Sequence, residues 1–278
     1  MGVRCIRLRF LGTGTSAGVP AIGQEPVSDD PRDVRLRTSA SLEFIDPGGQ
    51  ERVILIDAGP DLRQQALAAG MSRCDAILIT HNHVDHCWGL DEVRRFNVMM
   101  QKPIDVYADD HTIERLRDVY NHIFDPSRNR QRSFVASLIP RAVRPYEPFD
   151  LYGLRITPIT VLHGRVPILG FRFDLASSSG ESERSADGVL PLAYCTDASG
   201  FPPETWGYLD GLGVFVLDAL RYRSHPTHFT LGQSESVARR VDALRTFFVH
   251  MNGEVVHAEA EASLPPSIRL AYDGLVVS

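Results

Sequence analysis

The sequence predicts an α/β protein in which two packed β-sheets are flanked by helices. Strand-like apolar runs occur in both halves of the chain, and helix-like stretches are interspersed among them. The length of 278 residues and the 43% hydrophobic and 23% charged content are those of an ordinary globular protein. No internal repeat or dividing linker is visible, so we expect a single domain over residues 1–278.

The first half of the chain alternates strand and helix signals. Between its last two strands, Asp61 to Gly70 has a helix-like composition, with a glycine where a helix would stop. A further strand is expected at 104–108, followed by a helix at about 109–122. Short apolar runs predict the other strands at residues 6–11, 41–44, 53–57 and 76–80.

The second half shows the same alternation. Apolar residues at helical spacing, namely Val237, Val241, Leu244 and Phe248, predict a helix from about 231 to 247. The polar, small-residue-rich stretch 177–188 is interpreted as an exposed hairpin loop without a catalytic role. Apolar runs predict strands at residues 154–159, 170–174, 192–195, 214–217 and 246–249.

Composition and charge disfavour several classes of protein. The net charge of −6 argues against bulk binding of nucleic acid, which usually requires a basic excess. No apolar run approaches the roughly 18 residues of a membrane span, and residues 1–10 alternate apolar and basic side chains like a half-exposed strand, unlike a signal peptide. The cysteines are scattered without paired spacing, which suits a reducing cytoplasm: Cys5, Cys74, Cys87 and Cys195.

The segment Thr80-His81-Asn-His83-Val-Asp85-His86 carries the strongest chemical signal. It follows the apolar run 76–79, so the cluster begins where a buried strand ends. Alternate side chains of an extended segment share a face, which lets His81 and His83 converge on one ion while Asp85 and His86 address a second. Imidazole and carboxylate ligands suit Zn²⁺, Mn²⁺ or Fe²⁺. The alternative is a surface loop that is merely rich in histidine, but three of ten histidines within six residues disfavour it.

The pattern His-x-His-x-Asp-His resembles the signature of the metallo-β-lactamase superfamily. That resemblance implies an αββα sandwich and further ligands at later strand ends: His163 in Val-Leu-His-Gly, Asp197 in Tyr-Cys-Thr-Asp and His250 in Phe-Val-His. It implies that His81, His83 and His163 hold one ion, and that Asp197 bridges this ion to a second. The ligands of this second ion would be Asp85, His86 and His250.

The resemblance also gives Asp57 a position near the metals. Its implied role is to accept a hydrogen bond from a ligand histidine and so fix the tautomer of that histidine. The alternative reading is an aspartate that caps a turn before Gly59.

Three flanking segments look like those of the PhnP-type phosphodiesterase branch, so the resemblance covers nearly the whole chain. Read without the family, the glycine-rich opening at residues 11–20 would be only a tight turn, because it lacks the Gly-Lys-Ser/Thr ending of a P-loop. The matching segments are Leu11-Gly-Thr-Gly-Thr-Ser-Ala-Gly-Val-Pro20, Asp29-Asp-Pro-Arg-Asp33 with Arg37-Thr-Ser-Ala40, and Leu264-Pro-Pro with Ala271-Tyr-Asp-Gly-Leu275.

PhnP-like enzymes also place a histidine where His228 stands, 22 residues before His250. The resemblance implies that His228 acts as a general acid or contacts the phosphate, and imidazole titrates near working pH. The alternative is that His228 caps the following helix or bonds a loop. His225 is the weaker candidate for the same task.

A structural zinc that is common in this branch has no ligands here. The expected cysteine cluster is replaced by Ile22-Gly-Gln-Glu-Pro-Val-Ser28, and the expected histidine by Gly253. We therefore expect the segment from Gly23 to Arg35 to be held by other contacts or to move.

These features predict a metal-dependent phosphodiesterase that acts on a small phosphodiester, with a cyclic one favoured. Two divalent ions, Mn²⁺ or Zn²⁺, would activate water, and the catalytic residues would be Asp85 and His228. The alternatives are a ribonuclease Z-like nuclease, a thioesterase or a lactamase on the same metals, and, from a different class, a metal-binding protein without activity. We expect no membrane or nucleic-acid partner, and the resemblance makes a homodimer plausible.

Overall fold

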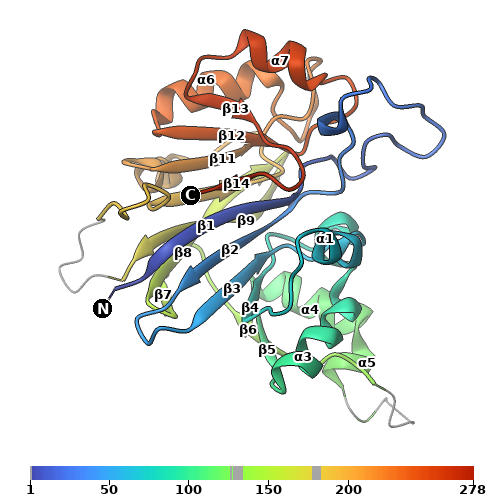
Figure 1. Cartoon of the computed structure of the whole chain (residues 1–278), viewed down its shortest axis with the longest axis vertical. Coiled ribbons are helices and arrows are strands. Elements are labelled where there is room, and N and C mark those ends of the chain that lie inside the picture. The colour runs from blue at the N-terminus through green and yellow to red at the C-terminus, as the bar shows by residue number, and fades with distance from the viewer. Residues whose placement is uncertain (1, 126, 128–133, 177–182) are drawn as a thin grey trace.

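Two seven-stranded sheets pack face to face, and helices lie outside them (Figure 1). This computed structural model describes residues 2–125, 127, 134–176 and 183–278. The two-sheet architecture flanked by helices confirms the predicted fold class. Among the described residues, no helix is both long enough and apolar enough to cross a bilayer.

The first sheet is built mainly by the N-terminal half of the chain and has the order β14-β1-β2-β3-β4-β5-β6. Its strands run antiparallel from β14 to β3 and parallel from β3 to β6. The strand bounds are β1 (Arg4–Gly12), β2 (Ser39–Ile45), β3 (Glu51–Ile56), β4 (Ala76–Leu78), β5 (Ile104–Ala108), β6 (Leu138–Ala142) and β14 (Val276–Val277).

The second sheet has the order β13-β12-β11-β10-β9-β8-β7. It is antiparallel from β7 to β10 and parallel from β10 to β13. The strand bounds are β7 (Phe149–Leu151), β8 (Leu154–His163), β9 (Val166–Leu175), β10 (Leu192–Cys195), β11 (Val214–Asp218), β12 (Arg245–Val249) and β13 (Ile268–Leu270).

The helices divide between the two sheets (Figure 1). Beside the first sheet lie α1 (Leu62–Ala68), α3 (Arg94–Met100), α4 (Asp110–Val119) and α5 (Asn121–Phe124), and beside the second lie α6 (Leu231–Val241) and α7 (His257–Ser263). The short helix α2 (Val84–Cys87) follows β4 after a loop. 3₁₀ segments occur at Pro31–Asp33, Leu90–Val93 and Pro203–Leu209.

The main core lies between the inner faces of the sheets. Along β1, Ile6, Leu8 and Phe10 alternate inward and are buried, as the period of two in a strand requires. Phe10 meets Phe247 of the other sheet with ring centroids 5.6 Å apart. Two further apolar clusters fill the space between each sheet and its helices, so both sheets are anchored on both sides.

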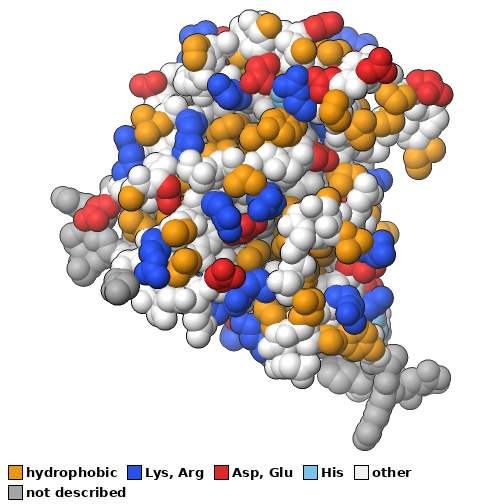
Figure 2. All heavy atoms as spheres, in the orientation of Figure 1, with side chains coloured by type: hydrophobic (Ala, Val, Ile, Leu, Met, Phe, Trp, Pro, Cys, Tyr) orange, Lys and Arg blue, Asp and Glu red, His pale blue; other side chains and the backbone are white. Residues whose placement is uncertain are grey.

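The outward side chains of β1 and β2 make a charged surface. Arg7 and Arg9 both pair with Glu43, at 3.2 and 2.8 Å. Figure 2 shows basic and acidic side chains side by side over β1 to β3. The basic alternation of the N-terminal segment is therefore that of a strand with one buried and one exposed face, as predicted.

The structure corrects some predicted boundaries. Helix α6 ends at Val241, not near residue 247, because Asp242 adopts a left-handed conformation (φ 52°) and residues 245–249 form the buried strand β12. The predicted helix at 109–122 ends at Val119 and continues as the separate turn of α5. The short strands β6, β7, β13 and β14 and helices α3 and α7 were not predicted, because short apolar runs do not distinguish strand from helix.

The predicted loop at 177–188 lies partly outside the described residues, which omit 177–182. Its described end is anchored to the body of the protein. Asp187 accepts a hydrogen bond from the backbone N–H of Ile6 at 2.9 Å, and Ser185 is buried. The strands that it connects, β9 and β10, are antiparallel neighbours, as a hairpin connection requires.

Candidate metal centre

The segments that follow β3, β4, β8, β10, β11 and β12 meet at one end of the sandwich. Five of these strands belong to parallel pairs, and carboxyl ends of parallel strands lie at the same edge of a sheet, where sites are usually built. The structure brings together there all seven residues expected to bind metal: His81, His83, Asp85, His86, His163, Asp197 and His250.

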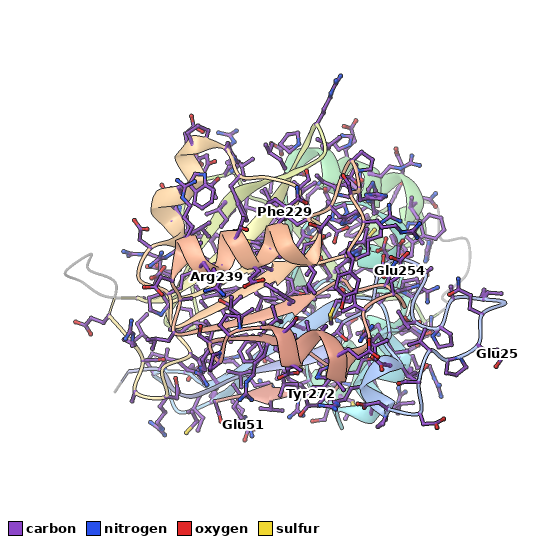
Figure 3. All side chains as sticks on the ribbon, turned by 90° about the horizontal axis from the view of Figure 1, so that it is seen from above. Glu25, Glu51, Phe229, Arg239, Glu254 and Tyr272 are labelled. Carbon is purple, nitrogen blue, oxygen red and sulfur yellow. The ribbon has the colours of Figure 1, made fainter. Side chains whose placement is uncertain are left out.

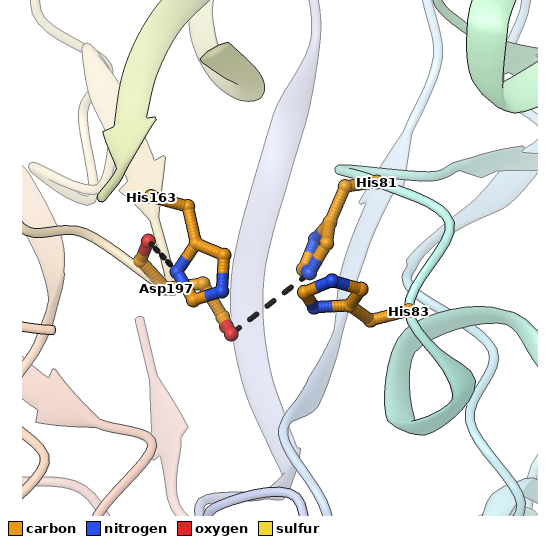
Figure 4. Close-up of side chains that lie close together, drawn as sticks. All are labelled: His81, His83, His163 and Asp197. Carbon is orange, nitrogen blue, oxygen red and sulfur yellow. Dashed lines mark hydrogen bonds and ion pairs between the residues drawn. The ribbon is translucent and has the colours of Figure 1, made fainter. Parts of the chain in front are cut away.

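One group consists of His81, His83, His163 and Asp197, each offering one ligand atom within 4.8 Å of the others. Figure 4 shows His81 and His83, which follow a strand of the first sheet, facing His163 and Asp197, which come from strands of the second. His81 Nε2 lies 3.9 Å from Asp197 Oδ2. His83 is exposed while the other three are buried, so the group opens to solvent on one side.

The second group consists of Asp85, His86, Asp197 and His250, all buried and also within 4.8 Å of one another. His86 Nε2 lies 3.1 Å from the carboxylates of both Asp85 and Asp197. His250 Nε2 lies 3.4 Å from Asp197 and 3.5 Å from Asp85. Asp197 thus belongs to both groups: its Oδ2 faces His81 and His250, and its Oδ1 faces His86.

Backbone contacts hold helix α2, which carries Asp85 and His86, against the turn after β3. The N–H of Ala58 donates to the carbonyl of His86 at 2.7 Å, and the N–H of Gly89 donates to the carbonyl of Ala58 at 2.7 Å. A Cβ at Gly59 would stand 2.0 Å from the carbonyl oxygen of Asp85. Glycine is therefore required at this crossing.

Asp57 accepts hydrogen bonds from the segment that carries the clustered histidines. Its carboxylate accepts from His86 Nδ1 at 2.7 Å and from the backbone N–H of Thr80 at 2.8 Å. Burial raises the pKa of Asp57 above its usual value, and the His86 imidazole opposes that rise. The hydrogen bond to Nδ1 leaves Nε2 of His86 facing the two-group centre, as proposed for an orienting partner of a metal ligand.

The unsatisfied atoms of this region fit a pair of divalent ions. Nε2 of His81 and Nε2 of His86 are buried and make no hydrogen bond in the described part of the chain, although carboxylates lie near both atoms. Such atoms are costly unless something else binds them. Nδ1 of His163 donates to the carbonyls of Asp197 and Thr227 at 3.0 and 2.9 Å, leaving Nε2 free. Imidazole and carboxylate donors without thiolate suit Zn²⁺ or Mn²⁺.

The electrostatics of the centre favour ionised carboxylates. Burial alone would raise the pKa of Asp197, but the His250 and His86 imidazoles lower it well below the usual value. The pKa of Asp85 is likewise low, because His86 and His250 outweigh the effect of burial. Carboxylates that stay ionised are the form that binds cations.

His228 lies beside the centre, as the resemblance implies, together with a residue that the sequence reasoning missed. The ring of His228 stacks on His250 with centroids 4.8 Å apart, and its Nδ1 lies 2.6 Å from Oδ2 of Asp218, a buried carboxylate at the end of β11. Asp218 ends an apolar strand, and Asp57 directly follows one. This shared pattern is the sequence signal that could have identified Asp218 as a site residue. His225, the weaker candidate, lies 5.1 Å from His228 by ring centroids.

The segment at 23–35 is anchored by a buried ion pair, which is one of the other contacts expected in place of a structural zinc. The Arg35 guanidinium meets Asp33 at 2.7 Å with 0% and 1% of the two side chains exposed. Arg35 also donates to the carbonyls of Asn252 and Val255, at 3.1 and 2.8 Å. The segment is thereby tied to the chain that follows His250.

A two-sheet sandwich with clustered histidines and aspartates at one edge defines a metal-dependent hydrolase of the metallo-β-lactamase fold. Residues 52–251 match the model of the beta-lactamase superfamily domain, and the chain belongs to this superfamily. The predicted family is thereby confirmed.

Three similar proteins extend this result. A structure described as a new diphosphatase from the PhnP family is 36% identical, with a TM-score of 0.83, and the match covers 99% of this chain and 97% of that one. An octanoyltransferase of Porphyromonas gingivalis is 34% identical over 98% of this chain, which spans only 51% of that relative. Coenzyme PQQ synthesis protein B of Xanthomonas axonopodis is 33% identical, covering 87% of this chain and 88% of the relative.

Proposed function

We propose that this protein is a metal-dependent phosphodiesterase that hydrolyses a small phosphodiester, with a cyclic phosphodiester favoured. The observation that carries the proposal is the pairing of two metal-ligand groups through Asp197 with His228 stacked directly beside them. This arrangement offers two ions for the phosphoryl group and one imidazole for the leaving oxygen. The 36% identity to a PhnP-family diphosphatase supports chemistry at phosphorus.

The ligand sets follow from the two groups. His81, His83 and His163 would hold one ion, Asp85, His86 and His250 the other, and Asp197 would bridge them. Bound Zn²⁺ or Mn²⁺ would supply positive charge for the phosphate oxygens and acidify a bound water. Asp85, kept ionised, would accept a hydrogen bond from that water and orient it toward phosphorus.

His228 would serve the leaving group. Because Nδ1 is engaged by Asp218, only Nε2 is available to the substrate. The attacking water would lose one proton to solvent, and its oxygen would bond to phosphorus as the bond from phosphorus to the leaving oxygen breaks. His228 in its imidazolium form would give its Nε2 proton to that leaving oxygen. Asp218 is a positioning residue, since it fixes the ring orientation and also accepts from the backbone N–H of Ala198 at 3.1 Å.

The test is turnover of bis(p-nitrophenyl) phosphate and of a nucleoside 2′,3′-cyclic phosphate by chelated protein and by protein reloaded with Mn²⁺ or Zn²⁺. We expect activity that depends on the metal and is lost in Asp85→Ala. Preference for the cyclic substrate would support the finer proposal. A reloaded protein that binds two ions and hydrolyses neither compound would refute it.

A second candidate is hydrolysis of a diphosphate bond, which the PhnP-family diphosphatase favours. The same metals and the same proton donor would serve, because both reactions displace an oxygen from phosphorus. An aryl diphosphate ester added to the assay separates the two. Thioester and lactam substrates test the remaining alternatives of this fold.

A further inference from the structure

A hollow of about 550 Å³ adjoins the proposed metal centre. It lies between the glycine-rich segment after β1, the loop after β11 and the turn after β12. The residues of its wall that matter here are Thr15, Ser16, Arg221, His225, Asn252 and Glu254. The rest of the wall is largely apolar and includes Ala21, Val27 and Leu220, so the hollow offers a few polar groups on an apolar surface.

A row of three histidine rings leads from the hollow to the centre. His225, which lines it, lies 5.1 Å from His228 by ring centroids, and His228 stacks on His250 at 4.8 Å. The other wall is fixed close by, because the N–H of Thr15 donates to the carbonyl of Met251 at 3.0 Å. A substrate whose phosphoryl group sits at the metals would extend its leaving group past His228 into this space.

Arg221 is held rigidly at the wall of the hollow. Its Nε and Nη2 donate to the carbonyls of Arg223 and Ser224, at 3.2 and 3.0 Å. Nη1 makes no hydrogen bond, and no carboxylate pairs with the guanidinium, within the part of the chain that the structure describes. The side chain is only partly exposed, so a charged group that it meets there is screened less than at an open surface.

Two glutamates also line the hollow, and Glu254 interacts more strongly with Arg223 than with Arg221. Glu254 is paired with Arg223, through both carboxylate oxygens. Glu25 also lines the hollow but is exposed, and Figure 3 shows it on a loop at the edge of the molecule. Arg221 is therefore a preorganised cation whose Nη1 group can still donate hydrogen bonds, and it lies beside the space into which the leaving group would extend.

We propose that Arg221 binds a second anionic group, a phosphate or a carboxylate, carried by the leaving group of the substrate. This inference rests on the proposed function, since it assumes that the phosphoryl group binds at the metals. A fixed guanidinium with free N–H donors is suited to the oxygens of either anion. Arg221 would then select doubly anionic substrates over singly anionic ones.

Calorimetric binding to the Zn²⁺-loaded protein tests this without turnover. The probes are methylphosphonate, a series of alkylene bisphosphonates with one to four methylenes, and phosphonocarboxylates with the same spacers. We expect one spacer length to bind about 10- to 100-fold more tightly than methylphosphonate, the range typical of a hydrogen-bonded charge. Arg221→Met should abolish that gain and leave methylphosphonate unchanged, and Arg221→Lys should retain part of it.

Arg117→Met is the matched control, because Arg117 is an exposed arginine on α4 outside the hollow. It removes the same charge and should keep the full gain. The assignment would be overturned if the gain in affinity over methylphosphonate were equal in wild type and Arg221→Met. It would also be overturned if Arg117→Met lowered that gain as much as Arg221→Met does. If methylphosphonate itself does not bind, the proposed function is refuted, because that function requires a phosphoryl group to bind at the metals. A gain restricted to bisphosphonates identifies phosphate as the second group, and an equal gain with phosphonocarboxylates identifies either anion.

Discussion

Arg35→Met should destabilise the protein severely, because the change leaves a buried carboxylate without its cation. Arg35 and Asp33 have 0% and 1% of their side chains exposed and meet at 2.7 Å. After the substitution Asp33 would keep only its neutral partners, the N–H of His257 at 2.8 Å and the hydroxyl of Ser28 at 2.6 Å. The carbonyls of Asn252 and Val255 would lose a donor as well.

Removing one member of a buried pair typically costs about 3–5 kcal/mol. That is a large part of the roughly 5–15 kcal/mol by which domains are stable. At about 2–4 °C per kcal/mol for a large domain, the melting temperature should fall by roughly 6–20 °C. Asp33→Asn combined with Arg35→Met should recover part of the loss, because no uncompensated charge then remains buried.

The assay is thermal and urea unfolding of the metal-loaded protein, with hydrogen exchange followed over residues 15–35. Arg32→Met is the matched control, because Arg32 pairs with Asp30 at the surface of the same segment and surface pairs contribute little. If both single variants shift the midpoint equally, or if the double variant is no more stable than Arg35→Met, the ion pair does not anchor this segment.

Three further outcomes are expected. His228→Ala should lower kcat by about 10²- to 10⁴-fold, the usual contribution of a proton donor. The control His111→Ala, on the exposed face of α4, should leave kcat unchanged. Equal kcat values in the two variants would show that His228 takes no part in catalysis. Asp57→Asn should weaken metal binding by about 10- to 100-fold in competition with a chelator, and an unchanged affinity would contradict the orienting role. Burial raises the pKa of Asp273 to about 6 from 3.8. Because the folded value is the higher one, the protein should lose about 3 kcal/mol of stability as the pH rises from 4 through 6. Urea unfolding of the chelated protein should show this slope and Asp273→Asn should lack it; equal slopes would refute the assignment.

The clustering of the candidate metal ligands could be predicted because each is marked by local sequence. An apolar run that ends in a histidine or an aspartate recurs at His81, His163, Asp197 and His250, and strands deliver their last side chains to one edge of the sheet. The two-sheet fold followed from the same runs. Resemblance to a known family set the order of the ligands, and the structure brings all seven together.

Boundaries were less predictable, because helical spacing alone cannot end a helix. The apolar positions Val237, Val241, Leu244 and Phe248 continue a helical pattern, yet the chain turns at Asp242 and Phe248 joins a central strand. Neighbouring strands β11 and β13 supply the hydrogen bonds that stabilise this choice, and they are distant in sequence.

The sequence by itself determined the fold class, the superfamily and the residue types available for two metal ions. Only the tertiary structure decided which partners those residues have. Asp218 reaches His228, Arg35 binds the carbonyls of Asn252 and Val255, and Arg221 faces the hollow beside His225. Such contacts depend on how loops from two packed sheets meet in space, and local periodicity carries no information about that meeting.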